Sequence, residues 1–249
     1  MRPGKAVLSV ANWVARRCGL VLLPAWRWDE VQGWGGQTFR LAGRDYPFFT
    51  HHYNCGRHPE TATERTVELP LADRWLARAP AESVVEVGAV TPYYWPGRVS
   101  RVVDPADTHP QVTDRRSLLD VDLTGRAVLC LSTLEHVGSG EYGQPTDAAL
   151  LHRAVEKLFA EAVAFLVTIP VGYAQHADAV LFDRPRPADV IARYLVRQPG
   201  PPYWAEVTDA AAARRPYGPT RTATGTFTHG ANALAVWERG SYFSGEGPG

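Results

Sequence analysis

The middle of the chain holds four short runs that consist mostly of apolar and β-branched residues. They span residues 83–87, 99–103, 127–131 and 165–169. Apolar runs without polar alternation are typical of strands that are buried on both faces, as in a parallel sheet covered by helices on both sides. The pattern therefore predicts four strands of one parallel sheet.

A helical pattern lies between the third and the fourth run. Over residues 147–164 apolar side chains recur at helical spacing, and Thr146 or Asp147 can cap the start of this helix. A strand, a helix and a second parallel strand in this order form a βαβ unit. We therefore predict an α/β, doubly wound fold with a mostly parallel sheet and helices on both of its faces.

Later segments complete the main domain, which we expect over residues 76–240. Residues 189–195 predict a further helix, whereas residues 204–207 and 231–237 predict late strands that can form an antiparallel pair. Residues 241–249 are rich in glycine and serine, and they predict a flexible tail.

The N-terminal part, residues 1–75, differs in composition because it holds five of the eight tryptophans. Residues 5–18 and 70–79 have helical spacing, and glycines at positions 33, 35, 36 and 43 predict a loop or a hairpin. We expect this aromatic-rich extension to act as a lid or substrate wall, or as a dimer contact.

Composition and charge exclude several classes of protein. The chain has 26 basic and 26 acidic residues, so no basic balance indicates nucleic acid or an anionic membrane as a partner. No apolar stretch reaches the roughly 20 residues of a membrane span. The three cysteines are widely spaced and odd in number, which favours a reducing cytoplasm. We expect a soluble, cytoplasmic monomer or homodimer. Of the 26 basic residues 24 are arginines, which indicates a GC-rich, bacterial genome.

Carboxylates lie close to the ends of the predicted strands, at positions that suit a nucleoside-containing ligand. In doubly wound sheets ligands bind at the carboxyl ends of the strands. Asp104 lies sixteen residues after Gly88, where a carboxylate can accept hydrogen bonds from two ribose hydroxyls. Asp120 and Asp122 precede the third run, where a side chain can reach an adenine amino group.

Three motifs together resemble those of class I S-adenosylmethionine-dependent methyltransferases. They are the Glu86-Val87-Gly88 strand end, the acidic end at Asp104, and the LSTLEHVG segment at residues 131–138. The resemblance implies a Rossmann-like class I methyltransferase fold.

The closer resemblance is to a bacterial subgroup that is often found in polysaccharide and sugar-modifying clusters. There, a similar STLEHVG segment precedes a helix and a TxPxGY strand end, which is TIPVGY at residues 168–173 here. Residues 64–68, ERTVE, are similar to another stretch of the subgroup, and the likeness extends from residue 53 to residue 237.

The resemblance implies S-adenosylmethionine as methyl donor and S-adenosylhomocysteine as product. The methionine end, the ribose and the adenine would be held by Glu86, Gly88, Ala89, Asp104, Asp120, Asp122, Ser132 and Thr133. The acceptor side would comprise His51, His52, Tyr53, Asn54, Arg65, Glu135 and Tyr173. His136 would be the catalytic residue, which takes a proton or orients the acceptor.

The glycine loop departs from the family pattern. Residues 88–92 keep only Gly88 of the usual three glycines, and ten residues separate Val87 from Arg98. A full helix does not fit in that length, so a helix N-terminus aimed at the cofactor carboxylate is shortened or missing.

Several of these residues also have structural interpretations. His136 can simply bond its own loop, and methyl transfer can proceed by positioning without a base. Arg65 can bind a carboxylate or phosphate, or pair with Glu64 or Glu68. Residues 51–54 can line the substrate or form a polar loop, and they lack ligand spacing for a metal. Cys130 is expected in the core, and residues 138–143 as a loop over the site rather than a phosphate loop.

Three functions fit these observations. The first is a methyltransferase that acts on oxygen or nitrogen of a small molecule, such as a sugar or a secondary-metabolite intermediate. The second is a catalytically inactive binding or scaffold protein of the same fold. The third keeps the pocket but catalyses a cyclisation or an elimination in a biosynthetic pathway.

Overall fold

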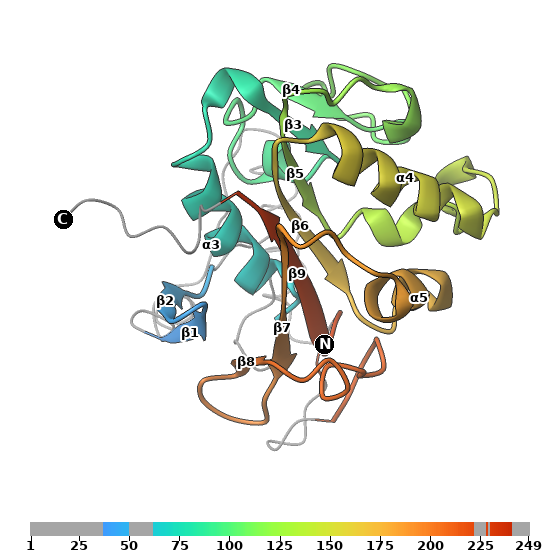
Figure 1. The fold of residues 1–249 in the computed structure, drawn as a ribbon. Helices are drawn as coiled ribbons and strands as arrows, with labels where there is room; N and C mark the ends of the chain where they lie inside the picture. Colours follow the sequence, from blue (N-terminus) through green and yellow to red (C-terminus); the bar gives the residue numbers. More distant parts are fainter. Residues whose placement is uncertain (1–36, 50–61, 222–227, 229, 241–249) are drawn as a thin grey trace, which may run out of the picture.

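The computed structural model describes residues 37–49, 62–221, 228 and 230–240. Within these ranges nine strands form one sheet in the order β2-β1-β8-β7-β9-β6-β5-β3-β4 (Figure 1). The predicted helix at residues 5–18 and the predicted C-terminal tail lie outside the described residues.

The four predicted runs form one parallel half of the sheet. They are β3 (Val84–Val87), β4 (Arg101–Val103), β5 (Ala127–Leu131) and β6 (Ala164–Pro170). β3 pairs in parallel with both β4 and β5, and β5 pairs in parallel with β6. Every residue of β3, β5 and β6 is buried, which is why their sequences show no polar alternation.

The other half of the sheet is antiparallel. β9 (Ala233–Arg239) lies between β6 and β7 (Val190–Arg197), and β8 (Trp204–Val207) follows β7. The hairpin of β1 (Thr38–Leu41) and β2 (Arg44–Pro47) adds to β8 through one parallel pair of residues. The described sheet is therefore mixed, and the prediction of a mostly parallel sheet was wrong.

One element was also assigned to the wrong class. Residues 189–195 were expected to be helical, but residues 190–195 lie in β7, which pairs with β8 on one side and β9 on the other. Tyr194, Leu195 and Val196 are buried in these contacts. Pairing with neighbouring strands decides the secondary structure of such a segment, because a short apolar run fits either a strand or a helix. The two late strands were correctly placed, but each pairs with β7 rather than with the other.

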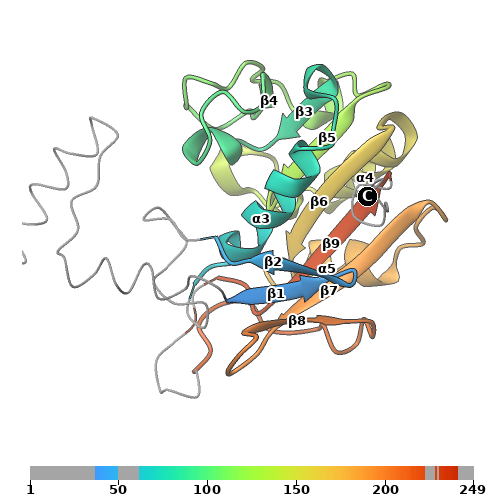
Figure 2. The same cartoon turned by 90° about the vertical axis from the view of Figure 1, so that its left-hand side faces the viewer.

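Helices cover both faces of the sheet, as predicted. α3 (Arg65–Leu76) lies on one face, and α4 (Ala148–Glu161) and α5 (Gln175–Asp183) lie on the other (Figures 1 and 2). In β5 the side chains alternate, so that Leu129 packs into the core beside α3 and Cys130 into the core beside α4. Cys130 is therefore a core residue, and burial raises the pKa of its thiol.

The first turn of α4 confirms a predicted cap. The Asp147 side chain accepts a hydrogen bond of 2.9 Å from the amide of Ala149. This carboxylate satisfies one of the free amide groups at the helix start. The apolar stripe that the sequence predicted, which includes Leu151, Val155 and Leu158, faces the sheet and is buried.

α3 begins earlier than predicted. The sequence indicated a helix over residues 70–79, but α3 starts at Arg65 and has Pro70 inside it. Proline has no amide hydrogen, so the carbonyl of Thr66 loses its helical partner. That carbonyl accepts a hydrogen bond from the amide of Phe49 instead, at 2.9 Å, and the Thr66 hydroxyl donates to the carbonyl of Phe49. The proline thus frees a group that ties α3 to the segment after β2.

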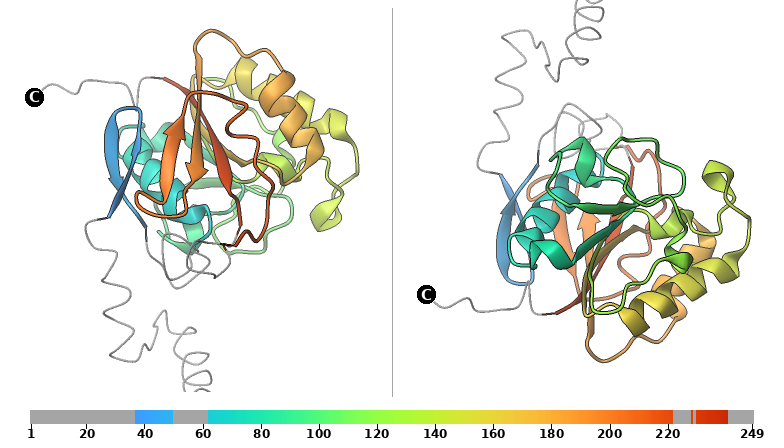
Figure 3. Two further views of the ribbon diagram at one scale, coloured as in Figure 1. Left: turned by 90° about the horizontal axis from the view of Figure 1, so that it is seen from below. Right: turned by 90° about the horizontal axis from the view of Figure 1, so that it is seen from above.

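The β1–β2 hairpin confirms the turn predicted at Gly43. Ala42 and Gly43 both have positive φ, 53° and 75°, which a tight hairpin turn requires. Views along the vertical axis place this hairpin at the side of the sheet away from α4 and α5 (Figure 3). The other three glycines of the predicted loop lie outside the described residues. None of the helices that the structure describes combines the length and apolar character needed to cross a bilayer.

The order of the parallel strands creates a natural binding position. β3 lies between β4 and β5, so the chain runs from β3 to β4 on one side and then crosses back to β5 on the other side. In doubly wound sheets a crevice forms at the carboxyl ends of strands where the winding direction changes in this way. A binding site is therefore expected at the loops that follow β3, β4 and β5.

Replacing Leu129 by Ala should lower the free energy of unfolding by about 2–5 kcal/mol, because the side chain is fully buried in β5, an interior strand of the sheet. Val163→Ala is the control, since 61% of Val163 is exposed, and it should change stability by less than about 0.5 kcal/mol. Urea unfolding of both variants measures the difference. Equal effects would contradict the burial of Leu129 in the core.

Candidate functional site

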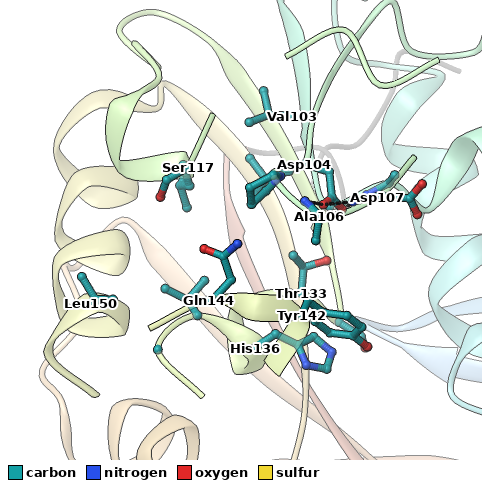
Figure 4. A pocket seen from close by; sticks show the side chains of 18 of the residues that line it. Val103, Asp104, Ala106, Asp107, Ser117, Thr133, His136, Tyr142, Gln144 and Leu150 are labelled. Carbon is teal, nitrogen blue, oxygen red and sulfur yellow. Dashed lines mark hydrogen bonds between the residues drawn. The ribbon is translucent and has the colours of Figure 1, made fainter. Parts of the chain in front are cut away.

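A cavity of about 460 Å³ opens at the carboxyl ends of β3, β4 and β5 (Figure 4). This volume is in the range of small-molecule sites. Its walls come from the loops after these strands, with Arg65 from α3 and Leu150 from α4; the loop residues are Val87–Val90, Val103–Asp107, Ser117–Leu119, Ser132, Thr133, His136–Gly138, Tyr142, Gln144 and Pro145. Seven predicted site residues line it: Arg65, Gly88, Ala89, Asp104, Ser132, Thr133 and His136.

The loop after β3 packs tightly against the loop after β5. Gly88 has φ +85°, and a Cβ atom at this position would lie 2.0 Å from Oγ1 of Thr133. Only glycine is compatible with both the backbone angle and the contact. The sequence predicted a glycine that lets a ligand approach the backbone closely, but here the neighbour that requires the missing side chain is Thr133.

Glu86 supports this loop from below. Its carboxyl group is fully buried and accepts hydrogen bonds from the amides of Val90 (3.0 Å) and Thr91 (2.6 Å) and from the Thr91 hydroxyl. Burial raises the pKa of Glu86 to about 7, although these hydrogen bonds act in the opposite direction. Glu86 does not line the cavity, so its structural role is to hold the loop.

The segment after this loop confirms the predicted lack of a full helix. Between β3 and β4 it contains a short 3₁₀ helix, Thr91–Tyr93, and no α-helix. The Val90 and Thr91 amides, which point to Glu86, are not available to a ligand in this arrangement. An anionic ligand group therefore has no helix N-terminus at this end of the cavity.

Asp104 joins two walls of the cavity. Its Oδ2 atom accepts a hydrogen bond of 3.0 Å from the amide of Ala89, and its Oδ1 atom accepts bonds of 2.9 Å from the amides of Ala106 and Asp107. A carboxylate can accept about four hydrogen bonds, so these three leave about one for a ligand hydroxyl. Asp104 is thus both a wall residue and the link between the loops after β3 and β4.

Ser132 and Thr133 form the wall at the end of β5. Ser132 has φ 40°, in the left-handed region, and its amide donates to the carbonyl of Thr168 at 3.0 Å. Its hydroxyl donates to Glu68 at 2.5 Å, and the Thr133 hydroxyl donates to the carbonyl of Leu131 at 3.0 Å. Such a backbone conformation persists only where its surroundings hold it, and it is commoner at functional sites.

Arg65 lines the cavity but is already paired. Its guanidinium donates to Glu68 and to the carbonyl of Leu131 at 3.3 Å, and its side chain is 15% exposed. Of the two interpretations of Arg65, the structure therefore contains the ion pair, with Glu68 as the partner. Glu64 bonds the amide of Ala231 instead, at 2.9 Å.

Glu135 is buried behind the wall rather than exposed to the cavity. It is 1% exposed, and its Oε2 atom has no hydrogen-bond partner. Burial raises the pKa of its carboxyl group well above the ordinary value, and the charge of Glu68 adds to this effect. Its Oε1 atom lies 3.7 Å from Nε2 of His136. A direct contact between Glu135 and an acceptor stays a prediction.

His136 lines the cavity, and its side chain does not bond the loop backbone. Its Nδ1 atom lies 2.5 Å from Oε2 of Glu141. Tyr173 does not line this cavity; its hydroxyl donates to Oε1 of Glu141 at 2.8 Å, and the ring borders a second, open hollow that also includes Tyr217. The structure therefore brings His136 and Tyr173 together through a residue that the sequence analysis did not single out.

Asp120 and Asp122 are exposed and lie outside the cavity wall. Asp122 accepts a hydrogen bond of 2.9 Å from the amide of Thr124, so its carboxylate is directed toward the backbone of its own loop. Position does not support their assignment to an adenine ring. In this segment the residues that line the cavity are Ser117, Leu118 and Leu119. The two leucines form an apolar pair within a polar stretch, and this pair could have indicated the wall from the sequence.

The loop after His136 covers one side of the cavity, as predicted for residues 138–143. Tyr142 and Gln144 belong to its wall (Figure 4), although the sequence analysis did not name them. His51, His52, Tyr53 and Asn54 lie outside the described residues. Across the described ranges, no group of three or more His, Cys, Asp and Glu side chains is arranged to hold a metal ion.

The cavity therefore has two chemically different ends. Figure 4 shows Leu150 at one end of the cavity, and Asp104 and His136 at the other. Leu118 and Leu119, which follow Ser117, add apolar wall to the cavity. A ligand with a flat apolar ring and several hydrogen-bonding groups would match both. Small-molecule sites commonly combine apolar walls with a few polar groups that fix orientation.

Replacing Glu86 by Gln should flatten the pH dependence of stability. The folded state raises the pKa from its ordinary 4.5 to about 7, so it binds the proton more tightly than the unfolded chain does. Stability therefore falls as the pH rises through this window, and Glu86 should account for about 2 kcal/mol of the loss between about pH 5 and pH 7.

Urea unfolding at both pH values measures this loss in the wild type, in Glu86→Gln and in the control Glu82→Gln. Glu82 is exposed on the surface beside β3, so its replacement should keep the wild-type slope. An unchanged slope in Glu86→Gln would show that the buried carboxyl group does not titrate in this window.

Comparisons with known proteins give weak likenesses. The sequence matches no family model and no curated protein. Among solved structures, the chain is similar to a precorrin 8W decarboxylase of Methanobacterium thermoautotrophicum, with 18% identity, 78% of this chain and 96% of that chain covered, and a TM-score of 0.34. It is also similar to the protein of a complex described as DhpI-SAM-HEP, with 15% identity, coverage of 68% and 85%, and a TM-score of 0.29. TM-scores this low establish neither a shared family nor an activity.

Proposed function

We propose that the cavity binds S-adenosylmethionine and that the chain transfers its methyl group to oxygen or nitrogen of a small-molecule acceptor. The observation that carries this proposal is the meeting of three sequence motifs in one cavity. The Gly88 loop, Asp104 and five residues of the segment from Ser132 to Gly138 line it together, at the point where the winding of the parallel strands reverses. The fold would then be a variant of the Rossmann-like class I methyltransferase fold.

The two ends of the cavity suggest how the donor would lie. Leu118, Leu119 and Leu150 would enclose the adenine ring, which is flat and largely apolar on its faces. Asp104 has about one free acceptor position, which suits a ribose hydroxyl. The methionine end would then lie between Ala89 and Ser132, at the carboxyl ends of β3 and β5.

The acceptor would approach from the side of His136 and Tyr142. Both line the cavity next to the proposed methionine end, and the ring centroids of His136 and Tyr142 are 5.1 Å apart. Bringing acceptor and donor together in line supplies a large part of the acceleration in a transfer reaction. A sugar or a related biosynthetic intermediate fits the resemblance of the sequence to a subgroup that is often found in polysaccharide and sugar-modifying clusters.

One observation favours a second candidate, a protein that retains the pocket but does not methylate. The amides of Val90 and Thr91 bond Glu86, and no α-helix begins after Gly88. The donor carboxylate would therefore lack the positive helix end that often binds anions in doubly wound folds. A cyclisation or elimination on a biosynthetic intermediate, or a purely binding role, would not need that interaction.

Calorimetric titration with S-adenosylhomocysteine distinguishes the two candidates. Methyl-donor binding predicts a dissociation constant in the micromolar range for the wild type. Ala106→Trp should weaken binding about ten-fold or more, because Ala106 is an exposed residue of the cavity wall and an indole there would fill the space.

The matched control is Ala211→Trp, which places the same side chain at an exposed position outside the cavity wall. It should bind like the wild type. A wild-type chain that fails to bind S-adenosylhomocysteine would exclude the methyltransferase and favour the second candidate. Binding that survives Ala106→Trp would place the ligand elsewhere.

A further inference from the structure

Glu141 is the meeting point of three hydrogen-bond donors beside the cavity. Its Oε2 atom lies 2.5 Å from Nδ1 of His136 and 3.2 Å from the hydroxyl of Ser139, and its Oε1 atom accepts a bond of 2.8 Å from the hydroxyl of Tyr173. The hydrogen bond with His136 lowers the pKa of Glu141 most, and that with Tyr173 lowers it further, against the effect of partial burial. Glu141 is therefore an ionised carboxylate.

The charge of Glu141 decides which nitrogen of His136 carries the proton. An ionised carboxylate only accepts hydrogen bonds, so at 2.5 Å the Nδ1 atom must be the donor. A neutral imidazole has one N–H group, and the Nε2 atom then carries a free lone pair. In the described part of the chain Nε2 has no hydrogen-bond partner, and Oε1 of Glu135 lies 3.7 Å away.

Packing holds the imidazole in this orientation. The ring of His136 contacts Tyr142 and Tyr173 edge-on, with centroid distances of 5.1 and 4.9 Å, and Tyr173 contacts Tyr217 at 4.9 Å. Burial raises the pKa of the Tyr173 hydroxyl, and the adjacent Glu141 raises it further, so Tyr173 remains a donor. Two elements support the imidazole: the loop after β5 and the segment that follows β6.

We propose that Tyr173, Glu141 and His136 form a relay in which Glu141 fixes the Nδ1–H tautomer and leaves Nε2 of His136 as the base of the cavity. The acceptor part rests on the proposed function: Nε2 takes the proton that an acceptor hydroxyl or amine loses on methylation. His136 would be catalytic, whereas Glu141 and Tyr173 would be positioning residues that act through it.

Every electron pair and proton of the methyl transfer is accounted for. A lone pair of the acceptor oxygen or nitrogen forms the new bond to the methyl carbon, and the electrons of the carbon–sulfur bond go to sulfur, which loses its positive charge. The acceptor proton moves to Nε2. The imidazolium that forms lies against the carboxylate of Glu141, and charge-assisted hydrogen bonds of this kind are stronger than neutral ones.

Carboxyl groups and tyrosine rings surround the imidazole of His136. Glu141 and Glu135 lie at its two ring nitrogens, and the rings of Tyr142 and Tyr173 flank it. Arg65, the one lysine or arginine among the described residues that line the cavity, is paired with Glu68. Proton uptake by His136 therefore places a positive charge among acidic and neutral groups.

Long-range ¹H–¹⁵N NMR of the ¹⁵N-labelled full chain tests the relay without ligand, because it reports the tautomer of each histidine. A His136→Gln variant identifies the His136 signals. The wild type should show His136 with the proton on Nδ1 at neutral pH. Glu141→Ala removes the acceptor, and the ratio of Nδ1–H to Nε2–H should fall about ten-fold or more.

Two further variants keep the test specific. Glu156→Ala, on the outer side of α4 and paired with Arg184, removes a carboxylate far from His136 and should leave the ratio unchanged. Tyr173→Phe removes one donor to Glu141, so it should lower the ratio less than Glu141→Ala does. A proton on Nε2 in the wild type, or an unchanged ratio in folded Glu141→Ala, would overturn the relay.

The result is separable from the titration with S-adenosylhomocysteine. If S-adenosylhomocysteine does not bind and the tautomer is as expected, His136 still stands as a base held by Glu141, and the methyl-donor assignment fails. If the ligand binds and Glu141→Ala leaves the tautomer unchanged, the relay fails and the donor site stands.

Discussion

The contact between Gly88 and Thr133 is the constraint on which the rest of the site depends. It brings the loops after β3 and β5 together so closely that no side chain fits between them. Ala89, next to Gly88, can then donate to Asp104, which links the loop after β4 to the same wall. Three loops from three parallel strands are thus joined by direct contacts, and together they form most of the cavity wall.

No α-helix begins after the glycine loop, and buried carboxyl groups bind the backbone amides and side chains of the loops around the cavity. Glu86 binds the two amides that follow the glycine loop, and Glu68 binds the Ser132 hydroxyl and Arg65. Burying such groups is costly unless hydrogen bonds compensate for the lost water. Glu135 has no such compensation at Oε2, and its strongly raised pKa is the consequence. The burial of carboxyl groups therefore both ties the loops together and raises the pKa values of Glu86 and Glu135.

Elements with strong local patterns were predictable, whereas elements defined by their neighbours were not. β5 and the apolar stripe of α4 follow from side-chain spacing, and the cap at Asp147 follows from residue type. β7 was taken for a helix because its apolar run fits both periods, and only pairing with β8 and β9 decides it. The start of α3 was missed because Pro70 normally ends helices, and the compensating bond comes from Phe49, seventeen residues before Thr66.

By itself, the sequence determined the parallel strands, the helices on both faces and the candidate residues at the strand ends, because each depends on the residue types within a few positions. Tertiary structure alone decided which candidates meet. It directs Glu86 to the loop backbone, leaves Asp122 on the surface, and joins His136 to Tyr173 through Glu141. The physical reason is that hydrogen-bond partners are chosen by distance in space, and strand pairing brings together segments that are far apart in the chain.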